Sequence, residues 1–222
     1  RYAETVDYKD YEKKVQKLLD TYVTSDEVIR ITDLVNIFDT DKFQEEVARV
    51  EGTAARADMI AHRTKRTIEE RYDDDPVFYE KFSKLIQKAI EDYRSSRIKE
   101  AEYFNRVSEY MEAVRDRKDD TIPSSLDNRQ VARAFFGVVN QTLIDHKKDG
   151  HPADKIADAA MKVDDIIVKN RVVDWQMKSD VQNKMMNELE DYLLDQSGID
   201  LDYDQVDLIM EKVIKIAKRR YE

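Results

Sequence analysis

The sequence contains no cysteine and, in 222 residues, only four glycines and three prolines. Without cysteine, disulfide bonds and thiolate metal sites are excluded. Glycine and proline punctuate turns, so their scarcity argues against a sheet-rich domain, which needs many turns. The glycines, at positions 52, 137, 150 and 198, are too scattered to form a phosphate-binding loop or a dinucleotide-binding fingerprint.

The spacings of familiar catalytic sites are also missing. The three histidines, at positions 62, 146 and 151, form neither a His-Glu-x-x-His zinc motif nor a Glu-x-x-His di-iron motif. There is no Gly-x-Ser-x-Gly nucleophile elbow. Asp26 and Glu27 resemble the acidic pair of a nucleotide-hydrolysing motor, but they open a predicted helix, whereas that pair should end a buried strand. We therefore expect no catalytic and no cofactor-binding residue in this chain.

Two acidic clusters, Asp73–Asp75 and Asp200–Asp207, could attract a cation by charge alone. They lack the spacing and the glycine of a calcium loop. We interpret them as helix caps and solvated loops, and we expect no metal site.

Long apolar runs are absent as well. No window approaches 18 uninterrupted apolar residues, so we expect no membrane-spanning segment and no membrane partner. No signal peptide is visible, and the chain opens on Arg1 rather than methionine. These features lead us to expect a cytoplasmic piece of a longer polypeptide.

What the sequence does have is charge and helical periodicity. Charged residues make up 39% of the chain, and 48 acidic residues against 38 Lys and Arg give a formal charge of −10. This composition is typical of long, solvent-exposed helices. We predict an all-α, multi-helix, bundle-like domain of about eight helices. The acid excess argues against a whole surface that binds nucleic acid, because phosphates need Lys and Arg.

Apolar residues recur at helical spacing through most of the chain. Residues 76–114 form either one long helix or two helices with a break at Arg94–Arg97, and residues 115–128 are the clearest connector. We therefore expect an N-terminal helical subdomain at 1–118 and a C-terminal one at 119–222, which together form one compact domain. The other predicted helices cover about 7–23, 24–39, 39–51, 53–72, 129–146, 153–170, 172–197 and 204–220.

Local signals mark several helix ends. Gly52 is expected to form a left-handed cap after one helix, and Thr53 to cap the next. Asp75 is predicted to be the N-cap of a helix, and Pro76 its first residue. In the last helix, six apolar residues are expected to face inward: Val206, Ile209, Met210, Val213, Ile214 and Ala217.

The segment 53–68 is unusual in an acidic chain, because it holds four basic residues, one histidine and one acid. Helical spacing places His62, Lys65 and Arg66 on one face and Arg56 and Arg63 on a neighbouring one. This helix either pairs its basic face with the protein's own carboxylates or offers it to a partner. Its small-residue stripe would let another helix approach closely: Ala57, Ala61, Thr64 and Ile68. The candidate contacts with a partner protein or DNA are Arg56, His62, Arg63, Lys65 and Arg66.

Trp175, the only tryptophan, is expected in the core rather than as an exposed anchor at a partner surface. The segment 170–175 is the one piece that could be extended. A stripe at helical spacing is also expected to be core: Met177, Val181, Met185, Leu189 and Leu193.

Six segments of the chain carry a resemblance to a known family: 23–39, 52–71, 74–94, 100–114, 132–139 and 171–194. In this order they resemble the C-terminal helical region of the R subunit of type I restriction enzymes. The similarity covers about residues 6–217 and includes no catalytic signature. The stretch after Leu194 departs from the family, since it is acidic and lacks proline, and Asn183–Leu194 is too acidic to inherit a basic contact surface.

This resemblance implies a parent subunit with an upstream nuclease and an ATP-dependent DNA translocase, which would use ATP and Mg²⁺ there. The parent would be a type I site-specific deoxyribonuclease. Its helical end would dock onto the methyltransferase core, made of modification and specificity subunits, and meet DNA through the whole complex. Two alternatives stay open: a DNA-contacting helical module of that complex, or a generic helical scaffold for protein interaction.

Overall fold

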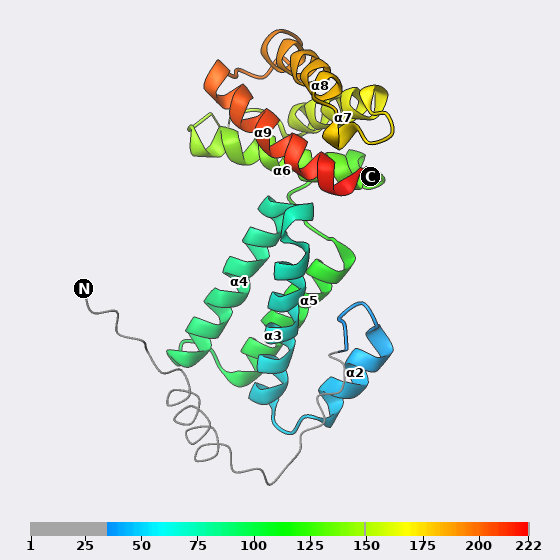
Figure 1. Ribbon diagram of the computed structural model, residues 1–222. Coiled ribbons are helices and arrows are strands. Elements are labelled where there is room, and N and C mark those ends of the chain that lie inside the picture. The colour runs from blue at the N-terminus through cyan, green and yellow to red at the C-terminus, as the bar shows by residue number, and fades with distance from the viewer. Residues whose placement is uncertain (1–34, 149, 222) are drawn as a thin grey trace, which may run out of the picture. The chain divides into compact units, whose positions relative to one another are not determined.

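The computed structural model describes residues 35–148 and 150–221. Within these ranges all regular elements are helical, with eight α-helices and no strand, which confirms the predicted all-α fold (Figure 1). No helix in the described ranges is long and apolar enough to cross a membrane. The helix predicted at 7–23, most of the one at 24–39, and the Asp26–Glu27 pair lie outside the described residues.

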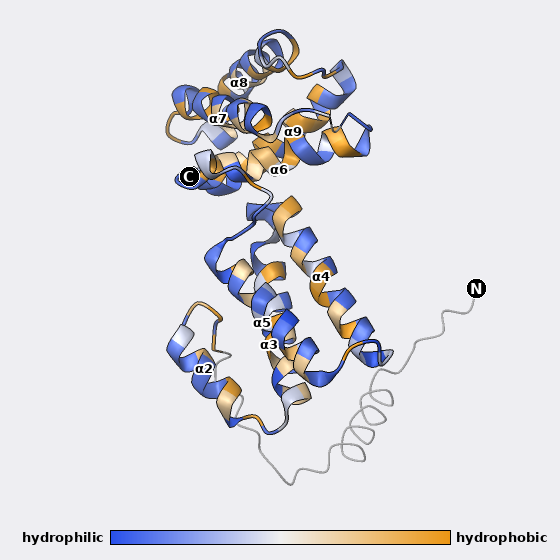
Figure 2. Ribbon diagram, turned by 180° about the vertical axis from the view of Figure 1, so that it is seen from behind, coloured by the Kyte–Doolittle hydropathy of each residue, from blue (hydrophilic) through white to orange (hydrophobic). Residues whose placement is uncertain are grey.

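The first group of helices follows a short α2 (Thr40–Arg49). It consists of α3 (Thr53–Arg71), α4 (Pro76–Arg94) and α5 (Glu100–Asp116), which lie side by side in Figures 1 and 2. The helix α3 packs chiefly against α5. The predicted small-residue stripe of α3 is buried, so this close approach is confirmed: Ala57, Ala61, Thr64 and Ile68.

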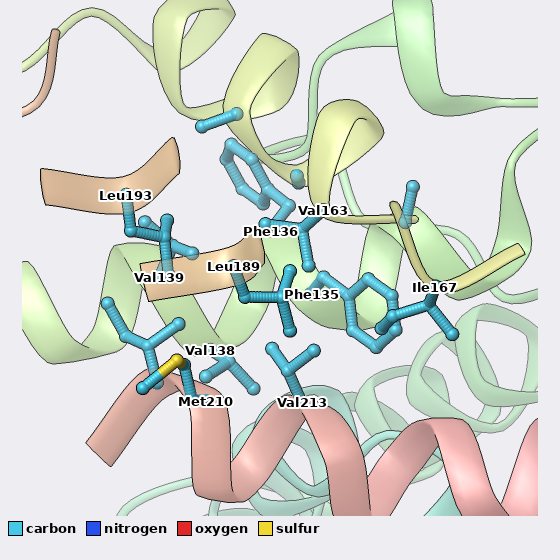
Figure 3. Close-up of a cluster of buried hydrophobic side chains, with 14 of the residues drawn as sticks. Phe135, Phe136, Val138, Val139, Val163, Ile167, Leu189, Leu193, Met210 and Val213 are labelled. Atoms are coloured by element: carbon cyan, nitrogen blue, oxygen red, sulfur yellow. The ribbon is translucent and has the colours of Figure 1, made fainter. Parts of the chain in front are cut away.

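The second group is built on α6 (Gln130–Asp145), α7 (Ala153–Asn170), α8 (Ser179–Asp191) and α9 (Tyr203–Arg220). Figure 2 shows hydrophobic residues gathered on α6 and α9, and these two helices pack against each other. Their buried side chains interdigitate with those of α7 and α8 (Figure 3), as Phe135, Val163 and Val213 illustrate. All six residues predicted to face inward on α9 are buried.

The two groups touch where α4 begins. A three-residue helix, η1 (Tyr72–Asp74), precedes α4, and its Asp73 and Asp74 form ion pairs with Lys215 and Arg219 of α9 at 3.1 and 3.3 Å. The predicted boundary between two subdomains, at residues 118 and 119, is a statement about which parts fold independently, and it stays a prediction.

The predicted start of α4 is confirmed, and the structure decides between the two alternatives left open for residues 76–114. The Asp75 side chain accepts a hydrogen bond from the Phe78 N–H, and Pro76 is the first residue of α4. Residues 95–99 separate α4 from α5, with Ser96 at a φ of +58°, so the segment 76–114 is a helix pair.

Gly52 was predicted to cap the end of the preceding helix, and this assignment is wrong. Its φ is positive, at +89°, but α2 already ends at Arg49, and Gly52 occupies the N-cap position of α3 with Thr53 as the first helical residue. Glycine has no side chain to cap the free N–H groups of α3. The sequence signal for a positive φ was right, and its assignment to the preceding helix was not.

Candidate functional site

Arg56, on the first turn of α3, turns toward the protein. Its Nε donates to the Val50 carbonyl at 2.7 Å, and its Nη2 donates to the Ala48 carbonyl at 3.4 Å. Carbonyls at the end of a helix lack partners within that helix. Arg56 therefore fastens the end of α2 to the start of α3.

Arg63 also faces the protein. Its guanidinium lies 3.7 Å from the Glu46 carboxylate of α2, and the two side chains are only 13% and 19% exposed. Because the protein interior screens charges less than water does, the attraction between these two opposite charges holds the buried side chains together. Arg56 and Arg63, which the sequence placed on one face, together hold α2 against α3.

The other three candidates lie nearer to solvent. Arg66 donates from Nε to Glu70 at 2.9 Å on the same helix, and Lys65 donates to the Gln87 side-chain oxygen on α4 at 3.0 Å. His62 is exposed and makes no hydrogen bond or ion pair within the described ranges. The structure thus separates the five predicted residues into two inward ties and three outward side chains, and their contact with a partner or DNA stays a prediction.

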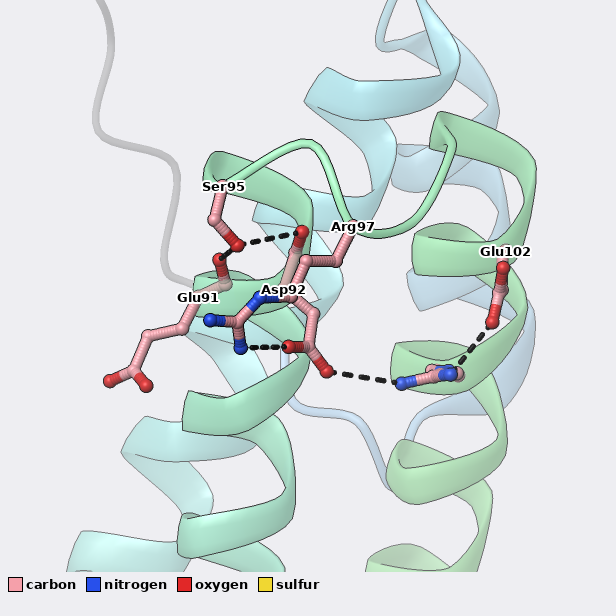
Figure 4. A network of polar contacts seen from close by, with 6 residues as sticks. Glu91, Asp92, Ser95, Arg97 and Glu102 are labelled. Carbon is pink, nitrogen blue, oxygen red and sulfur yellow. Dashed lines mark hydrogen bonds and ion pairs between the residues drawn. The ribbon is translucent and has the colours of Figure 1, made fainter.

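Lys65 borders a shallow groove between α3 and α4. The groove is also lined by three other cationic residues, Lys84, Lys88 and Arg97, and by two acidic residues, Glu91 and Asp92. Figure 4 shows the Asp92 carboxylate in the α4–α5 turn, where it accepts a hydrogen bond from the Arg97 guanidinium, at 3.2 Å. The Asp92 backbone carbonyl also accepts from the Arg97 N–H at 2.8 Å. A second guanidinium, that of Arg106, lies 3.5 Å from the other carboxylate oxygen of Asp92.

Each acidic cluster contains a helix cap, as predicted. In the first, Asp75 caps α4 and pairs with Arg117 at 2.8 Å. In the second, Asp202 forms a capping box with Gln205 at the start of α9. Among the described residues no group of His, Asp and Glu is arranged to hold a metal ion.

The loop between α7 and α8 holds a surface that the sequence interpretation missed. Trp175 is buried, with 1% of its surface exposed, so its prediction as core is confirmed. Met177 is 92% exposed, so its prediction as core is wrong. The rest of the stripe holds: Val181 is partly buried against the core, and Met185, Leu189 and Leu193 are buried. Met177 lies outside α8, which begins at Ser179, in a separate short turn, η3 (Trp175–Met177).

Met177 is one of four exposed apolar side chains in this region. Val173 is 81% exposed, Val172 49%, and Val168, on the last turn of α7, 42%. Scattered exposed apolar residues are common, but four within ten residues form a concentration that marks contact surfaces. We call Val168, Val172, Val173 and Met177 the α7–α8 surface.

Tyr221 fixes the backbone that carries this surface. Its carbonyl accepts hydrogen bonds from Trp175 Nε1 at 3.2 Å and from the Gln176 side chain at 2.7 Å. The Arg171 guanidinium lies 4.7 Å from the centre of the Tyr221 ring. The Tyr221 hydroxyl donates to the buried Asp164 of α7. Burial, together with the Asp164 carboxylate, raises the pKa of Tyr221, so the phenol stays a donor at neutral pH.

A second set of bonds closes the loop from the side of α8. Gln182 donates to the carbonyls of Trp175 and Gln176 at 3.2 and 2.7 Å. Asp174 adopts a left-handed conformation, with a φ of +57°, which aspartate tolerates better than most residues. The loop is therefore anchored through its polar atoms and its tryptophan, while its valines and methionine point into water. The sequence did contain one signal of this surface: the pair Val172–Val173 fits neither the apolar spacing of α7 nor that of α8.

The comparisons with known proteins agree on one kind of enzyme. The model of a family described as "Type I restriction enzyme HindI endonuclease subunit-like, C-terminal" matches residues 2–222. A curated relative from Methanocaldococcus jannaschii, named "Putative type I restriction enzyme MjaIXP endonuclease subunit", is 23% identical over 223 residues, which covers 96% of this chain and 20% of that protein. The chain thus spans about a fifth of the length of this relative. No solved structure gave a significant match. The family match over nearly the whole length shows that the chain belongs to the family of C-terminal regions of type I restriction endonuclease subunits.

Proposed function

We propose that this chain is the assembly region of its endonuclease subunit and docks that subunit onto a methyltransferase core of modification and specificity subunits. In this proposal the region does no chemistry itself. The nuclease and the ATP-dependent DNA translocase, with their ATP and Mg²⁺, belong to other parts of the subunit. DNA is reached through the whole complex, in the cytoplasm.

The observation that carries this proposal is the exposure of the α7–α8 surface. Val173 and Met177 keep more than four-fifths of their area in water while the backbone beneath them is tied down by Tyr221 and Gln182. A rigid loop with exposed apolar side chains loses little conformational entropy when a partner covers it. Family membership supports the identity of the partner, because a restriction endonuclease subunit acts within a multi-subunit enzyme.

The experiment compares the intact endonuclease subunit with a form that lacks this region, each mixed with purified modification and specificity subunits. We expect the intact subunit to co-elute with the methyltransferase in size-exclusion chromatography and the shortened one to elute alone. Circular dichroism and ATP hydrolysis of the shortened subunit check that the remainder is folded. Normal assembly without the region would refute the proposal.

A second candidate function, contact with DNA, has one observation in its favour. Lys65, Lys84, Lys88 and Arg97 line the groove between α3 and α4, and His62 and Arg66 lie close to Lys65 on α3. Lys65 is held only by the neutral Gln87, and Lys88 has no partner among the described residues. Such cations could neutralise phosphates.

Titration of short duplex DNA at several salt concentrations distinguishes this candidate. If the groove binds phosphates, the affinity falls steeply with salt, and the variant Lys65→Ala with Lys88→Ala lowers the salt slope by about two. The matched control is Lys42→Ala with Lys184→Ala, two exposed lysines outside the groove. An unchanged slope in the groove variant would exclude this role.

A further inference from the structure

We propose that the α7–α8 surface enters an apolar cleft rimmed by carboxylates on the modification subunit. This inference rests on the proposed assembly function and adds the place of contact and the chemistry of the partner surface. Three properties of the described loop support it: its apolar centre, its cationic rim and its fixed backbone.

The centre of the contact is apolar. Val173 and Met177 are the most exposed of the four side chains, and Val172 and Val168 are exposed to a lesser degree. Hot spots of protein interfaces are side chains that become fully desolvated in a pocket of the partner. Methionine adapts to irregular apolar pockets because it is unbranched and polarizable. The partner must therefore supply a cleft rather than a flat polar face.

The rim of the contact is cationic. From residue 168 to residue 184 four cations stand against two acids, Asp174 and Asp180, in a protein whose formal charge is −10. Arg171 and Lys178, which flank the two valines and the methionine, are both exposed. Lys169 and Lys184 share Glu188 but remain 69% and 66% exposed. Opposite charge around an apolar centre steers association and selects the partner, so carboxylates are expected around the cleft.

The same charge pattern argues against two other occupants. A symmetric contact between two copies of this chain would set one cationic rim against another, which costs free energy. A nucleic acid would meet the cations but would offer no apolar cleft for Val173 and Met177. A carboxylate-rimmed apolar cleft on a protein satisfies both parts of the surface.

The fixed backbone supports the choice of this loop over other exposed apolar residues. Tyr221 receives two hydrogen bonds from the loop, and Gln182 donates two more to it. Tyr203, at 69% exposure, is the other strongly exposed large apolar side chain in the described part, and it stands alone at the start of α9. It therefore serves as a matched control.

The test measures the affinity of the full endonuclease subunit for the modification subunit by titration calorimetry. The variant Val173→Ser with Met177→Ser is expected to bind at least about tenfold more weakly, because it removes the apolar centre. The control Tyr203→Ser is expected to bind like the wild type. Both variants change exposed side chains, so an unaltered melting temperature and unaltered Trp175 fluorescence verify the fold.

A second variant tests the rim. Lys178→Glu is expected to slow association severalfold at low salt, with the difference shrinking at high salt, because steering by exposed charges is screened. A rate unchanged at every salt concentration, or a faster one, contradicts carboxylates on the partner.

The outcomes separate the two levels of the proposal. If the wild-type subunit fails to bind any methyltransferase subunit, the assembly function falls and this inference with it. If the wild type binds and the loop variant binds within about twofold of it, only the assignment of the α7–α8 surface falls. If the loop variant instead abolishes self-association in sedimentation experiments, the occupant is a second copy, and the inference is overturned.

Discussion

Asp75 makes two stabilising interactions at the start of α4. It caps the helix through the Phe78 N–H, and it neutralises Arg117, whose guanidinium also lies 4.8 Å from the centre of the Phe78 ring. Burial raises the pKa of the Asp75 carboxyl, while Arg117 and the Phe78 N–H act in the opposite direction. With only 2% of Asp75 exposed, its removal would strand a largely buried cation.

We predict that Asp75→Ala lowers the free energy of unfolding by about 3–5 kcal/mol, the usual cost of breaking a buried ion pair from one side. Urea denaturation followed by circular dichroism measures it. The control is Asp73→Ala two residues earlier, whose pair with Lys215 is 59% and 70% exposed and should contribute less than about 1 kcal/mol. Equal losses in the two variants would show that burial of the Asp75 pair does not matter.

Asp119, in the connector after α5, should give the protein a pH dependence in acid. Burial alone would raise the pKa of its carboxyl, but hydrogen bonds from Lys81 and from Thr121 outweigh that effect and lower the pKa below 3.8. The Lys81 ammonium lies 2.7 and 2.8 Å from the two carboxylate oxygens. Because the folded-state pKa is lowered, this stabilisation is present above the ordinary pKa and is lost as the pH falls through the folded value.

We predict that Asp119→Asn lowers the free energy of unfolding at about pH 7 by about 1.5–3 kcal/mol, a typical value for hydrogen bonds to a charged group. The difference from the wild type should shrink as the pH falls below 3.8 and through the lowered pKa of Asp119, because the wild-type carboxyl then becomes protonated as well. Urea midpoints across this pH range provide the measurement. A difference that is constant with pH would rule out the charge of Asp119 as its source.

At the scale of elements, Gly137 sets how closely α4 and α6 approach. A Cβ at this position would lie 3.2 Å from the Cβ of Val77, an atom that cannot rotate away. Glycine in a helix interior costs about 1 kcal/mol relative to alanine, so its presence in α6 is compensated by this contact.

We predict that Gly137→Val destabilises the fold by about 1–3 kcal/mol through overpacking. Adding Val77→Ala should recover part of this loss, because it removes the two Val77 methyl groups, which lie 3.4 and 3.8 Å from the position of the added Cβ, although the Val77 Cβ remains. Thermal unfolding of both single variants and of the double variant completes the cycle. Additive effects would mean that the two residues do not limit the approach of these helices.

Helices were largely predictable from the sequence because their signals are local. The Asp75–Pro76 start, the buried stripe of α3 and the inward face of α9 all follow from residues within a few turns of each other. Met177 shows the limit of this approach. It continues the four-residue spacing of α8 but lies outside that helix, so the period alone placed it in the core.

The candidate site was less predictable because its contacts join residues far apart in the chain. Arg56 and Arg63 were recognised as unusual, but their acceptors on α2 were not. The α7–α8 surface depends on Tyr221, which lies 46 residues beyond Trp175, and no local pattern links the two. Contact of His62, Lys65 and Arg66 with a partner stays a prediction.

At the scale of the whole described part, Tyr221 connects the end of the chain's last helix to α7 and to the α7–α8 loop. Its ring and hydroxyl engage Arg171 and Asp164, and its carbonyl holds Trp175 and Gln176. Since Trp175 is the only tryptophan, tryptophan fluorescence reports on the surroundings of this one side chain.

We predict that Tyr221→Ala loosens the loop before the rest of the protein unfolds. In the wild type, denaturation curves from Trp175 fluorescence and from circular dichroism should coincide, as expected for one cooperative transition. In the variant, the fluorescence transition should come at lower denaturant. Tyr221→Phe, which keeps the ring beside Arg171 and loses only the hydroxyl, should show a much smaller separation, and the backbone carbonyl is present in both variants. Coincident curves in Tyr221→Ala would show that the loop does not depend on this side chain.

The exposure of Met177 also has a chemical consequence. Peroxide oxidises accessible thioethers first and turns an apolar side chain into a polar sulfoxide, a change that methionine sulfoxide reductases reverse. The chain has no cysteine to compete for the oxidant, and of its seven methionines Met177 is the one with a largely exposed side chain. Mild oxidation is therefore expected to act at the centre of the α7–α8 surface and to leave the core intact, which makes this surface the part of the protein most sensitive to oxidative stress.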